Sequence, residues 1–503
     1  MVTQACIMNQ QADLRRTPAE PEAALRGKGC FGAGDGGGKA SRREFLKTAM
    51  VSGAGVGLLG AAPQVVTGKA VQEGKAKNLI LMVADGMNMG TLSLANHYKK
   101  RTTGSGTAWM ELYGRPGVRR GLMETWSANS LVTDSAAAGS AWGIGERVNN
   151  GSINVTPDGR RPVPAWVRAK QAGKLTGLVT TTRMSHATPA SFAANVDHRD
   201  EEDRIAEQYL ERGVDVVLGG GSEHFAPEKR KDGKDLWKRY GKQGYTVLRE
   251  RAALRAGLGG SERVLGIFGE DHLPYALDLE HEAELRQQVP SLGEMTEAAL
   301  ERLERGRDGF VLMVEGGRVD HAGHANDAAG ILREQLAFDD AVAAGRRFVE
   351  KNPETLLIVT TDHGTGGAMV NGVGHAYLGT DDAFARVDSA RHSFEYMFPR
   401  LLASEANLGE IFEASLGFAP TKDLVRSLAD TVRQVRSGGL GERALARVLA
   451  KPVGERTGIR FTSQNHTADH VELAAVGPGS EGIPPALENR QLHGIYMRAL
   501  GIE

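Results

Sequence analysis

Carboxylates and imidazoles gather densely after one apolar run of this sequence, residues 310–314. Glu315 follows the run directly, a Gly-Gly turn comes next, and Asp320 and His324 then lie four residues apart. Carboxylate oxygen and imidazole nitrogen are the usual ligands of zinc where thiolates are absent. This stretch on its own therefore predicts a metal site.

Two further apolar runs end in the same kinds of side chain. Residues 79–84 are followed by Asp85, and residues 356–360 by Asp362 and His363 after one threonine. A carboxylate at the tip of a buried strand is costly unless a cation meets it. Taken alone, however, an aspartate and glycine after a strand also form an ordinary turn.

Ser135 begins a predicted helix of small residues directly after Asp134. Its hydroxyl would lie near free backbone N–H groups and the positive end of the helix dipole, a position that favours phosphate. Taken alone, the segment is better explained as a plain N-cap. His466 precedes the apolar run 471–476, and by itself it is typical of a loop histidine. Its importance depends on the other four segments.

The elements that must position these side chains alternate between strands and helices. Seven short runs, rich in Val, Ile and Leu, fit strands buried on both faces. These runs are residues 79–84, 175–181, 214–218, 264–268, 310–314, 356–360 and 471–476. Helix-like segments are residues 135–143, 164–172, 201–211, 291–305 and 327–350. The alternation predicts a three-layer α/β/α sandwich with a central, mostly parallel sheet and ligands at the carboxyl ends of its strands.

Residues 390–452 differ from this pattern, because they look mostly helical with few strand-like runs. We expect them to form an insertion that packs beside the sheet or covers the crevice. The length of 503 residues allows about three domains, but α/β folds often grow as one unit with insertions. One catalytic domain, residues 71–503, is therefore the expectation.

The composition is that of a soluble globular protein, with 24% charged and 41% hydrophobic residues. Both cysteines, Cys6 and Cys30, lie in the first 30 residues. A disulfide framework, a four-thiolate zinc site and a cysteine nucleophile are therefore excluded from the rest of the chain. The formal net charge is -1, and the chain beyond residue 70 is mildly acidic, which gives no support for nucleic acid as a partner.

The N-terminal region resembles a twin-arginine export signal. Ser41-Arg42-Arg43-Glu44-Phe45-Leu46-Lys47 precedes a short apolar stretch, residues 48–62, which is too short to anchor the chain in a bilayer. Residues 1–70 are then a removable signal region, the twin-arginine translocation machinery is a partner, and the protein is periplasmic or secreted. The alternative is a basic patch before a short buried helix. The true start could also be internal, at Met8.

In this order the segments resemble the alkaline phosphatase family, from about Asn78 to Gly479. The matching motifs are Thr133-Asp134-Ser135-Ala136-Ala137, Val314-Glu315-Gly316-Gly317 with Asp320 and His324, and Asp362-His363. A further match is Met184-Ser185-His186-Ala187-Thr188-Pro189-Ala190, with Arg199 thirteen residues after His186. The specificity is high because these motifs match independently at the family's spacings.

The resemblance implies two zinc ions and a third metal, usually magnesium. Asp320, His324 and His466 would hold the first zinc; Asp85, Asp362 and His363 the second, with Ser135; and Asp85, Thr188 and Glu315 the third ion. Arg199 would hold two phosphoryl oxygens, and His186 and His321 would support the site. Many bacterial members have Asp and Lys in place of these two histidines, and a second histidine in place of Thr365.

The implied activity is that of an alkaline phosphatase, a phosphoric monoester hydrolase acting on small phosphomonoesters through a phosphoserine on Ser135. A serine hydroxyl is a weak nucleophile, and coordination to zinc can activate it. A planar guanidinium such as that of Arg199 suits the non-bridging oxygens of a monoester. Two alternatives remain open: a phosphodiesterase or phosphonate hydrolase of the same superfamily, and a non-catalytic exported phosphate- or metal-binding protein. Family members are often homodimers, and the sequence itself leaves the oligomeric state open.

Overall fold

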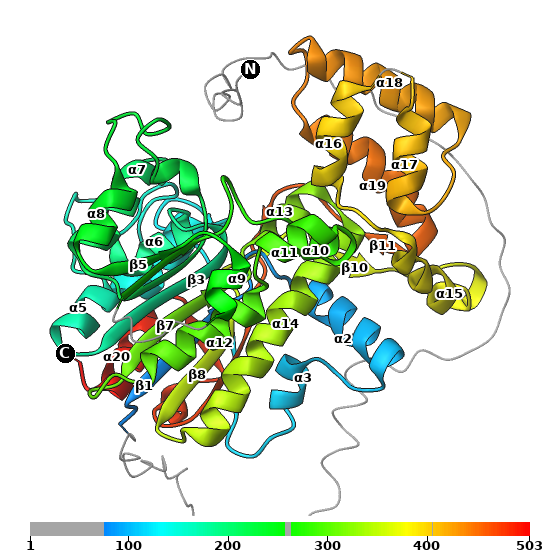
Figure 1. Cartoon of the computed structure of the whole chain (residues 1–503). Coiled ribbons are helices and arrows are strands. Elements are labelled where there is room, and N and C mark those ends of the chain that lie inside the picture. The colour runs from blue at the N-terminus through cyan, green and yellow to red at the C-terminus, as the bar shows by residue number, and fades with distance from the viewer. Residues whose placement is uncertain (1–74, 257–262, 405, 503) are drawn as a thin grey trace, which may run out of the picture. The chain divides into compact units, whose positions relative to one another are not determined.

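The computed structural model describes residues 75–256, 263–404 and 406–502 (Figure 1). The predicted signal region, residues 1–70, lies outside these described residues together with both cysteines. Within the described part of the chain, no helix has the length and hydropathy needed to cross a bilayer.

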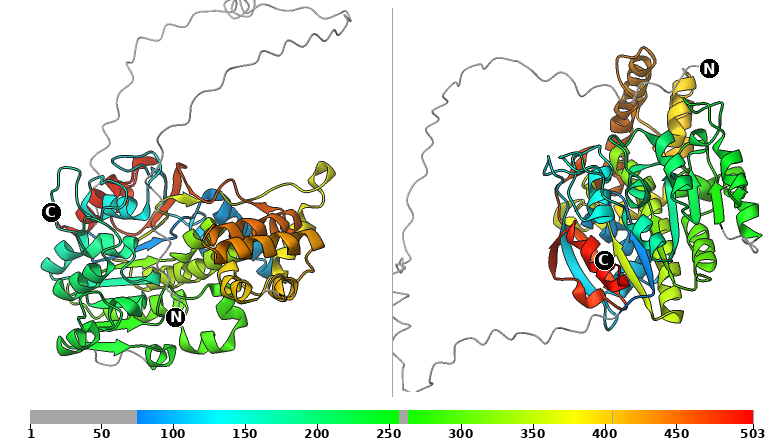
Figure 2. Two further views of the ribbon diagram at one scale, coloured as in Figure 1. Left: turned by 90° about the horizontal axis from the view of Figure 1, so that it is seen from above. Right: turned by 90° about the vertical axis from the view of Figure 1, so that its left-hand side faces the viewer.

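A ten-stranded sheet forms the centre of the described chain, seen from two further sides in Figure 2. In spatial order its strands are β14 (Ala486–Glu488), β2 (Arg119–Glu124), β13 (Val471–Val476), β8 (Thr355–Thr360), β1 (Asn78–Val83), β7 (Phe310–Glu315), β3 (Leu175–Arg183), β4 (Val216–Gly220), β6 (Arg263–Ile267) and β5 (Tyr245–Leu248). Only β13 in this sheet runs against the others, because it pairs antiparallel with both β2 and β8. All seven predicted runs are strands of this sheet, which confirms the expected mostly parallel arrangement.

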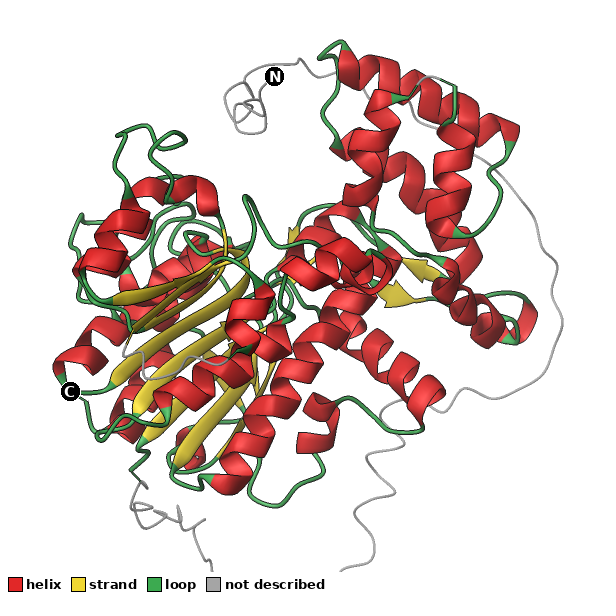
Figure 3. Cartoon of the chain, viewed as in Figure 1, coloured by secondary structure: helices red, strands yellow, loops and turns green. Residues whose placement is uncertain are grey.

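Helices cover both faces of the sheet (Figure 3). Successive residues of β1 point to opposite faces: Ile80 and Met82 belong to one buried apolar cluster, and Leu79 and Leu81 to the other. The first cluster includes side chains from α2 (Met89–Thr103), α3 (Ala108–Leu112), α12 (Leu292–Leu303) and α14 (Ala328–Lys351). The second includes side chains from α4 (Ser135–Ile144), α5 (Ala165–Gln171), α6 (Ala187–Ala193), α7 (Glu202–Glu211), α8 (Leu236–Lys242) and α20 (Gln491–Leu500). The predicted three-layer sandwich is therefore confirmed.

Shorter elements connect these layers. The helices among them are α9 (Arg251–Arg255), α10 (Ala276–His281), α11 (Ala283–Gln288), α13 (Arg318–Ala325) and α15 (Thr380–Ala385). Two small antiparallel pairs join β10 (Met369–Val370) to β11 (Ile459–Arg460) and β9 (Gly364–Thr365) to β12 (His466–Thr467). The strands β2, β5 and β14 were not predicted. In β2 the sequence RRGLME alternates exposed and buried positions instead of forming an apolar run.

Four helices follow β10 and α15 and together occupy the region between Phe394 and Thr457 (Figure 1). They are α16 (Phe394–Ala403), α17 (Leu408–Leu416), α18 (Lys422–Arg436) and α19 (Arg443–Thr457). Phe394, Phe412, Leu428 and Leu449 are fully buried within the same apolar cluster as α14. The four helices therefore share a continuous core with one face of the sandwich.

A buried aspartate fixes the start of α16. The backbone N–H and the hydroxyl of Ser393 both donate to the carboxylate of Asp278, at 2.8 and 2.6 Å. Beside it, the backbone N–H of Phe394 donates to Asp327 at 2.8 Å. Burial raises the pKa of Asp278 to about 6, although its hydrogen bonds with Ser393 oppose that rise. The carboxyl group of Asp278 therefore titrates at a pH where an exposed aspartate is already ionised.

Replacing this group, Asp278→Asn, should flatten the pH dependence of stability. Because the pKa of Asp278 is raised, the folded parent protein retains a proton that its unfolded chain has already lost. The stability that this proton gives the parent is full below the ordinary aspartate pKa and is lost as the pH rises through about 6. The free energy of unfolding of the variant, relative to the parent, should rise by up to about 3 kcal/mol between about pH 4 and pH 8. Urea denaturation at both pH values measures it. The exposed Asp381, changed to asparagine, is the control, and equal profiles for both variants would contradict the assignment.

Candidate active site

Three neighbouring strands bring three carboxylates to one edge of the sheet. Val83 of β1 is in register with Glu315 of β7 on one side and with Thr360 of β8 on the other. Asp85 and Asp362 each lie two residues beyond the registered position of their strand. These three side chains are fully buried, and they meet where an open α/β sheet places its ligand crevice.

Gly86 allows the end of β1 to approach α13 closely. Its φ is +74°, and a Cβ atom there would lie 2.6 Å from Cα of Asp320. Any other residue would therefore be both strained and in collision with the backbone. The N–H of Gly86 donates to Oδ1 of Asp362 at 3.1 Å, so the same residue also orients a carboxylate.

The first group of candidate ligands consists of Asp320, His324 and His466. Asp320 and His324 lie one turn apart on α13, where residues four apart face the same side. His324 Nε2 is 3.4 Å from Asp320 Oδ2 and 3.0 Å from His466 Nε2. The pairing of β12 with β9 places His466 opposite Thr365. The structure thus brings together the three residues predicted for one ion.

The outer nitrogens of these two histidines are held by backbone carbonyls. His324 Nδ1 donates to the carbonyl of Gln464 at 2.7 Å, and His466 Nδ1 donates to that of Thr133 at 2.8 Å. In its neutral form each ring therefore presents an unprotonated Nε2 to the group, which is the form that binds metal. Burial also lowers the pKa of His466.

The second group consists of Asp85, Asp362 and His363. His363 Nε2 lies 3.1 Å from Asp362 Oδ2 and 3.6 Å from Asp85 Oδ1, and all three side chains are fully buried. Ser135 opens α4 with its Oγ 3.4 Å from the same Nε2. A predicted nucleophile therefore lies against the second predicted ligand set, and the interaction links residues 228 positions apart in sequence.

The third group surrounds the other side of Asp85. Thr188 Oγ1 is 3.5 Å from Asp85 Oδ2, and Nδ1 of His186 is 4.0 Å from Glu315 Oε1. Asp85, His186 and Glu315 together could hold an ion. However, Arg199 Nη2 donates to His186 Nε2 at 2.8 Å, so a neutral His186 has its hydrogen on Nδ1. In that tautomer Nε2 of His186 positions Arg199, and its Nδ1 carries a hydrogen and has no lone pair to offer a cation.

The charges of these groups fit divalent cations. Burial raises the pKa of Asp85 well above its ordinary value, and the neighbouring Asp362 raises it further. Burial also raises the pKa of Glu315. Within the described part of the chain, Asp85 Oδ1, Asp362 Oδ2 and Glu315 Oε1 have no hydrogen-bond donor. Buried acceptors of this kind need a positive partner; carboxylate with imidazole is a donor set of zinc, and oxygen donors alone suit magnesium.

Two residues beside these groups, Asp134 and His186, hold the guanidinium of Arg199. Its Nη1 lies 3.2 Å from Asp134 Oδ2, and its Nη2 contacts His186. Burial opposes the charge of Arg199, but Asp134 and Asp85 raise its pKa, so the guanidinium stays cationic. Asp134 Oδ1 also accepts the N–H of Ala137 at 2.9 Å as the N-cap of α4. One aspartate therefore positions both the anion-binding arginine and the helix that begins at Ser135.

Replacement of that aspartate, Asp134→Ala, should lower the free energy of unfolding by about 1 kcal/mol, because the first turn of α4 loses its cap. The matched variant Asp134→Asn keeps an acceptor oxygen for Ala137 and removes the charge. It should retain most of the stability in the same urea titration. An equal loss in both variants would show that the contact with Arg199, and not the cap, stabilises the helix.

Two residues outside the predicted ligand sets also lie near the site, and one of them, His272, was missed by sequence reasoning. Thr365 donates to Asp320 Oδ1 at 2.5 Å and lies 3.3 Å from His363 Nδ1, so it joins the first two ligand groups. His272 packs its ring 4.4 Å from that of His321, and its Nδ1 accepts the N–H of Arg183 at 3.1 Å. His272 follows β6, one of the predicted strands, so its position after an apolar run could have indicated it. Thr365 was identified from sequence only as the position where many family members have a second histidine.

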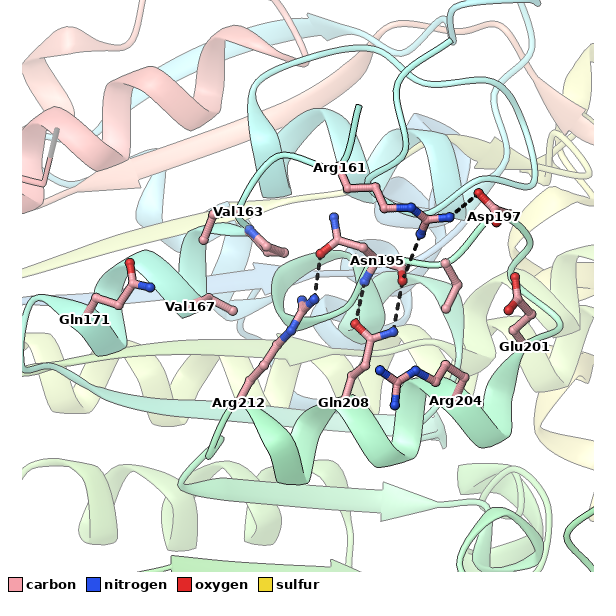
Figure 4. A pocket seen from close by; sticks show the side chains of 12 residues that line it. Arg161, Val163, Val167, Gln171, Asn195, Asp197, Glu201, Arg204, Gln208 and Arg212 are labelled. Carbon is pink, nitrogen blue, oxygen red and sulfur yellow. Dashed lines mark hydrogen bonds and ion pairs between the residues drawn. The ribbon is translucent and has the colours of Figure 1, made fainter. Parts of the chain in front are cut away.

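A separate hollow of about 470 Å³ lies between α5 and α7 (Figure 4). Its arginines already have protein partners: Arg161 is 2.5 Å from Asp197, and Arg212 donates to Asn195 Oδ1 at 2.8 Å. Arg204 pairs with glutamates of its own helix. Among the described residues, no predicted site residue lines this hollow. We therefore place the chemistry at the carboxyl ends of β1, β7 and β8.

The comparisons with known proteins agree with this geometry. The alkaline phosphatase family model matches residues 76–502. Alkaline phosphatase 4 of Bacillus subtilis is 30% identical over 471 residues, covering 91% of this chain and 97% of that relative. The crystal structure of Thermus thermophilus alkaline phosphatase shows 38% identity and a TM-score of 0.79, covering 88% of this chain and 96% of that one. A cold-active alkaline phosphatase from a psychrophilic Shewanella shows 27% identity and a TM-score of 0.71, covering 84% and 99%.

A mostly parallel sheet with buried groups at its carboxyl edge that could hold metal ions is typical of an enzyme of the α/β class. The chain belongs to the alkaline phosphatase family, and it is a phosphomonoesterase. The resemblance drawn from the sequence motifs is thereby confirmed. The roles of the individual site residues, and the identity of the metals, are matters for the proposal below.

Proposed function

We propose that this enzyme hydrolyses phosphate monoesters through a phosphoserine intermediate on Ser135. The observation that supports it most directly is the position of Ser135 at the first turn of α4, buried, with its Oγ 3.4 Å from His363 Nε2. Free N–H groups and the helix dipole at this end favour the negative charge of a bound phosphoryl group.

The three groups of side chains would hold three cations. Asp320, His324 and His466 suit one zinc, and Asp85, Asp362 and His363 suit a second, because imidazole with carboxylate favours that metal. The donors Asp85, Thr188 and Glu315 are all oxygens and suit magnesium. When bound, the cations would lower the pKa of the serine hydroxyl and neutralise charge on the phosphoryl group and the departing oxygen.

The chain's own residues orient the phosphoryl group. Arg199, fixed by Asp134 and His186, offers two parallel N–H donors to two non-bridging oxygens. The Ser135 hydroxyl loses its proton to water, and its Oγ forms a bond to phosphorus as the bond to the ester oxygen breaks on the opposite side. The departing alcohol oxygen takes up a proton from water. Water attacks the phosphoserine in a second displacement, which releases phosphate and restores the hydroxyl of Ser135.

A comparison of two nitrophenyl esters tests this assignment. A diester has one fewer free oxygen for Arg199 to bind. The kcat/KM for p-nitrophenyl phosphate should therefore exceed that for bis-p-nitrophenyl phosphate by at least about a hundredfold, which corresponds to the loss of one or two charged hydrogen bonds. A preference for the diester would establish a phosphodiesterase instead. Absence of turnover on both esters in the metal-loaded protein would favour a binding protein.

Export through the twin-arginine translocation machinery is part of the same proposal. It is supported by the motif that contains Arg42 and Arg43 ahead of an apolar stretch. That route transports folded proteins, and the ligand groups of this site come from segments as distant as Asp85 and His466, so the metal groups exist only in the folded chain. The destination would be the periplasm or the medium.

A further inference from the structure

We propose that Arg443 and Arg447 form a subsite that binds an anionic group on the leaving alcohol of the substrate. The preferred substrates would then be phosphomonoesters whose alcohol itself carries a carboxylate or a second phosphate. This inference rests on the proposed function, because it extends the site of phosphoryl transfer outward to the part of the substrate that departs.

The subsite is a hollow of about 360 Å³ between the start of α19 and the chain that leads into β12. Its lining is almost entirely polar apart from one aromatic ring. The lining residues are Asn326, Arg443, Arg447, Phe461, Thr462, Ser463, Gln464 and Asn465. α19 packs against α13, the helix that provides Asp320 and His324 (Figure 1).

The hollow adjoins the first group of candidate ligands. Gln464 lines it, and the carbonyl of Gln464 accepts the hydrogen bond from His324 Nδ1 at 2.7 Å. His466 lies two residues beyond Gln464, and Asn326 lies two residues beyond His324. Both chain segments that hold ligands of this group therefore continue directly into the wall of the hollow.

The departing oxygen leaves toward this group. Ser135 Oγ contacts His363 of the second ligand group, and in an in-line displacement the ester oxygen departs on the side of phosphorus opposite the nucleophile. Of the other two groups, the third shares Asp85 with the second, so we assign the departing oxygen to the group formed by Asp320, His324 and His466. A substituent on the alcohol would therefore extend past His324 and His466 toward Gln464 and α19.

The arginines supply unpaired positive charge at that place. Arg443 and Arg447 are four residues apart on α19, so they share one face of the helix, and both are exposed. Arg447 Nε donates to Gln464 Oε1 at 2.7 Å, which holds the guanidinium against another residue of the lining. Across residues 75–256, 263–404 and 406–502, neither guanidinium has a carboxylate in ion-pair distance. In the hollow of Figure 4, by contrast, Arg161 and Arg204 are paired with carboxylates.

A matched pair of aryl esters tests the subsite. Phenyl phosphate and 4-carboxyphenyl phosphate differ by one carboxylate at the far end of a rigid leaving group. The quantity measured is the kcat/KM for 4-carboxyphenyl phosphate divided by the kcat/KM for phenyl phosphate, called the ester ratio. It is measured for each variant in the metal-loaded full chain. The double variant Arg443→Gln, Arg447→Gln should lower this ratio by about tenfold, as expected for loss of a charged hydrogen bond. Its kcat/KM on phenyl phosphate should stay within about twofold of the parent, because both side chains are exposed.

The variant Lys422→Gln removes an exposed charge of the same sign at the start of α18, away from the hollow, and should leave the ratio unchanged. The parent protein offers a second measurement: raising the salt concentration should lower its ratio, because exposed charges are screened. A ratio that responds neither to the double variant nor to salt, while phenyl phosphate is turned over normally, would overturn the subsite. Failure of the parent to hydrolyse phenyl phosphate would instead overturn the proposed function.

Discussion

The variant Ser135→Ala should lower kcat on p-nitrophenyl phosphate by at least about 10⁴-fold, the scale of loss seen when a covalent nucleophile is removed. Ser135 opens α4 beside His363, and no other serine or threonine is proposed to form the covalent intermediate. The variant should retain the cation proposed for this place, since Asp85, Asp362 and His363 remain. Steady-state kinetics and elemental analysis of the purified protein measure the two effects together.

Ser140→Ala is the matched control for this experiment. Ser140 lies on the same helix and is equally buried, but its hydroxyl accepts the N–H of Asn154 at 2.9 Å and has no place in the proposed mechanism. It should lower stability by about 1 kcal/mol and leave kcat nearly unchanged. If Ser135→Ala remained active with full metal content, the phosphoserine mechanism would be wrong. Loss of zinc from that variant would show that the hydroxyl is needed to hold the ion.

The central part of the site could be predicted from sequence because of how parallel strands end. Buried strands of a parallel sheet are continuous Val, Ile and Leu runs, so β1, β7 and β8 stand out without any pattern of alternation. Their carboxyl ends meet at one edge, and Asp85, Glu315 and Asp362 follow directly. Local sequence and global topology therefore indicate the same place.

Other parts could not be predicted because they depend on pairing between short and distant segments. β9 and β12 have two residues each, too few for any periodicity, yet their pairing places His466 opposite Thr365. Thr365 is bonded to Asp320 only because α13 and β9 meet in the fold. The hollow beside Arg443 likewise exists only where α19 approaches the chain before His466.

Removing divalent cations with a chelator should abolish monoester hydrolysis and lower the Tm by about 5 °C or more. A single ion present at about 1,000 times its dissociation constant stabilises the folded state by about 4 kcal/mol, and a chain of this length loses about 1 °C per kcal/mol. Asp85, Asp362 and Glu315 are fully buried at one place. Without cations these carboxyl groups must either take up protons or remain as buried charges that repel each other, and both cost folding free energy.

The loss of Tm on chelation should grow as the pH rises from about 6 to about 9. Burial raises the pKa values of Asp85 and Asp362 in the metal-free protein, so its folded state retains protons that the unfolded chain has lost. Stability present at low pH is then lost as the pH rises through those raised values, whereas the metal-loaded protein keeps its carboxylates ionised and paired. Scanning calorimetry with and without chelator measures the difference, and Asp362→Asn should reduce it at alkaline pH while Asp381→Asn should not. If the melting temperatures with and without chelator were equal at high pH, protein groups alone would balance the charges of the buried carboxylates. The three proposed metal sites would then be wrong.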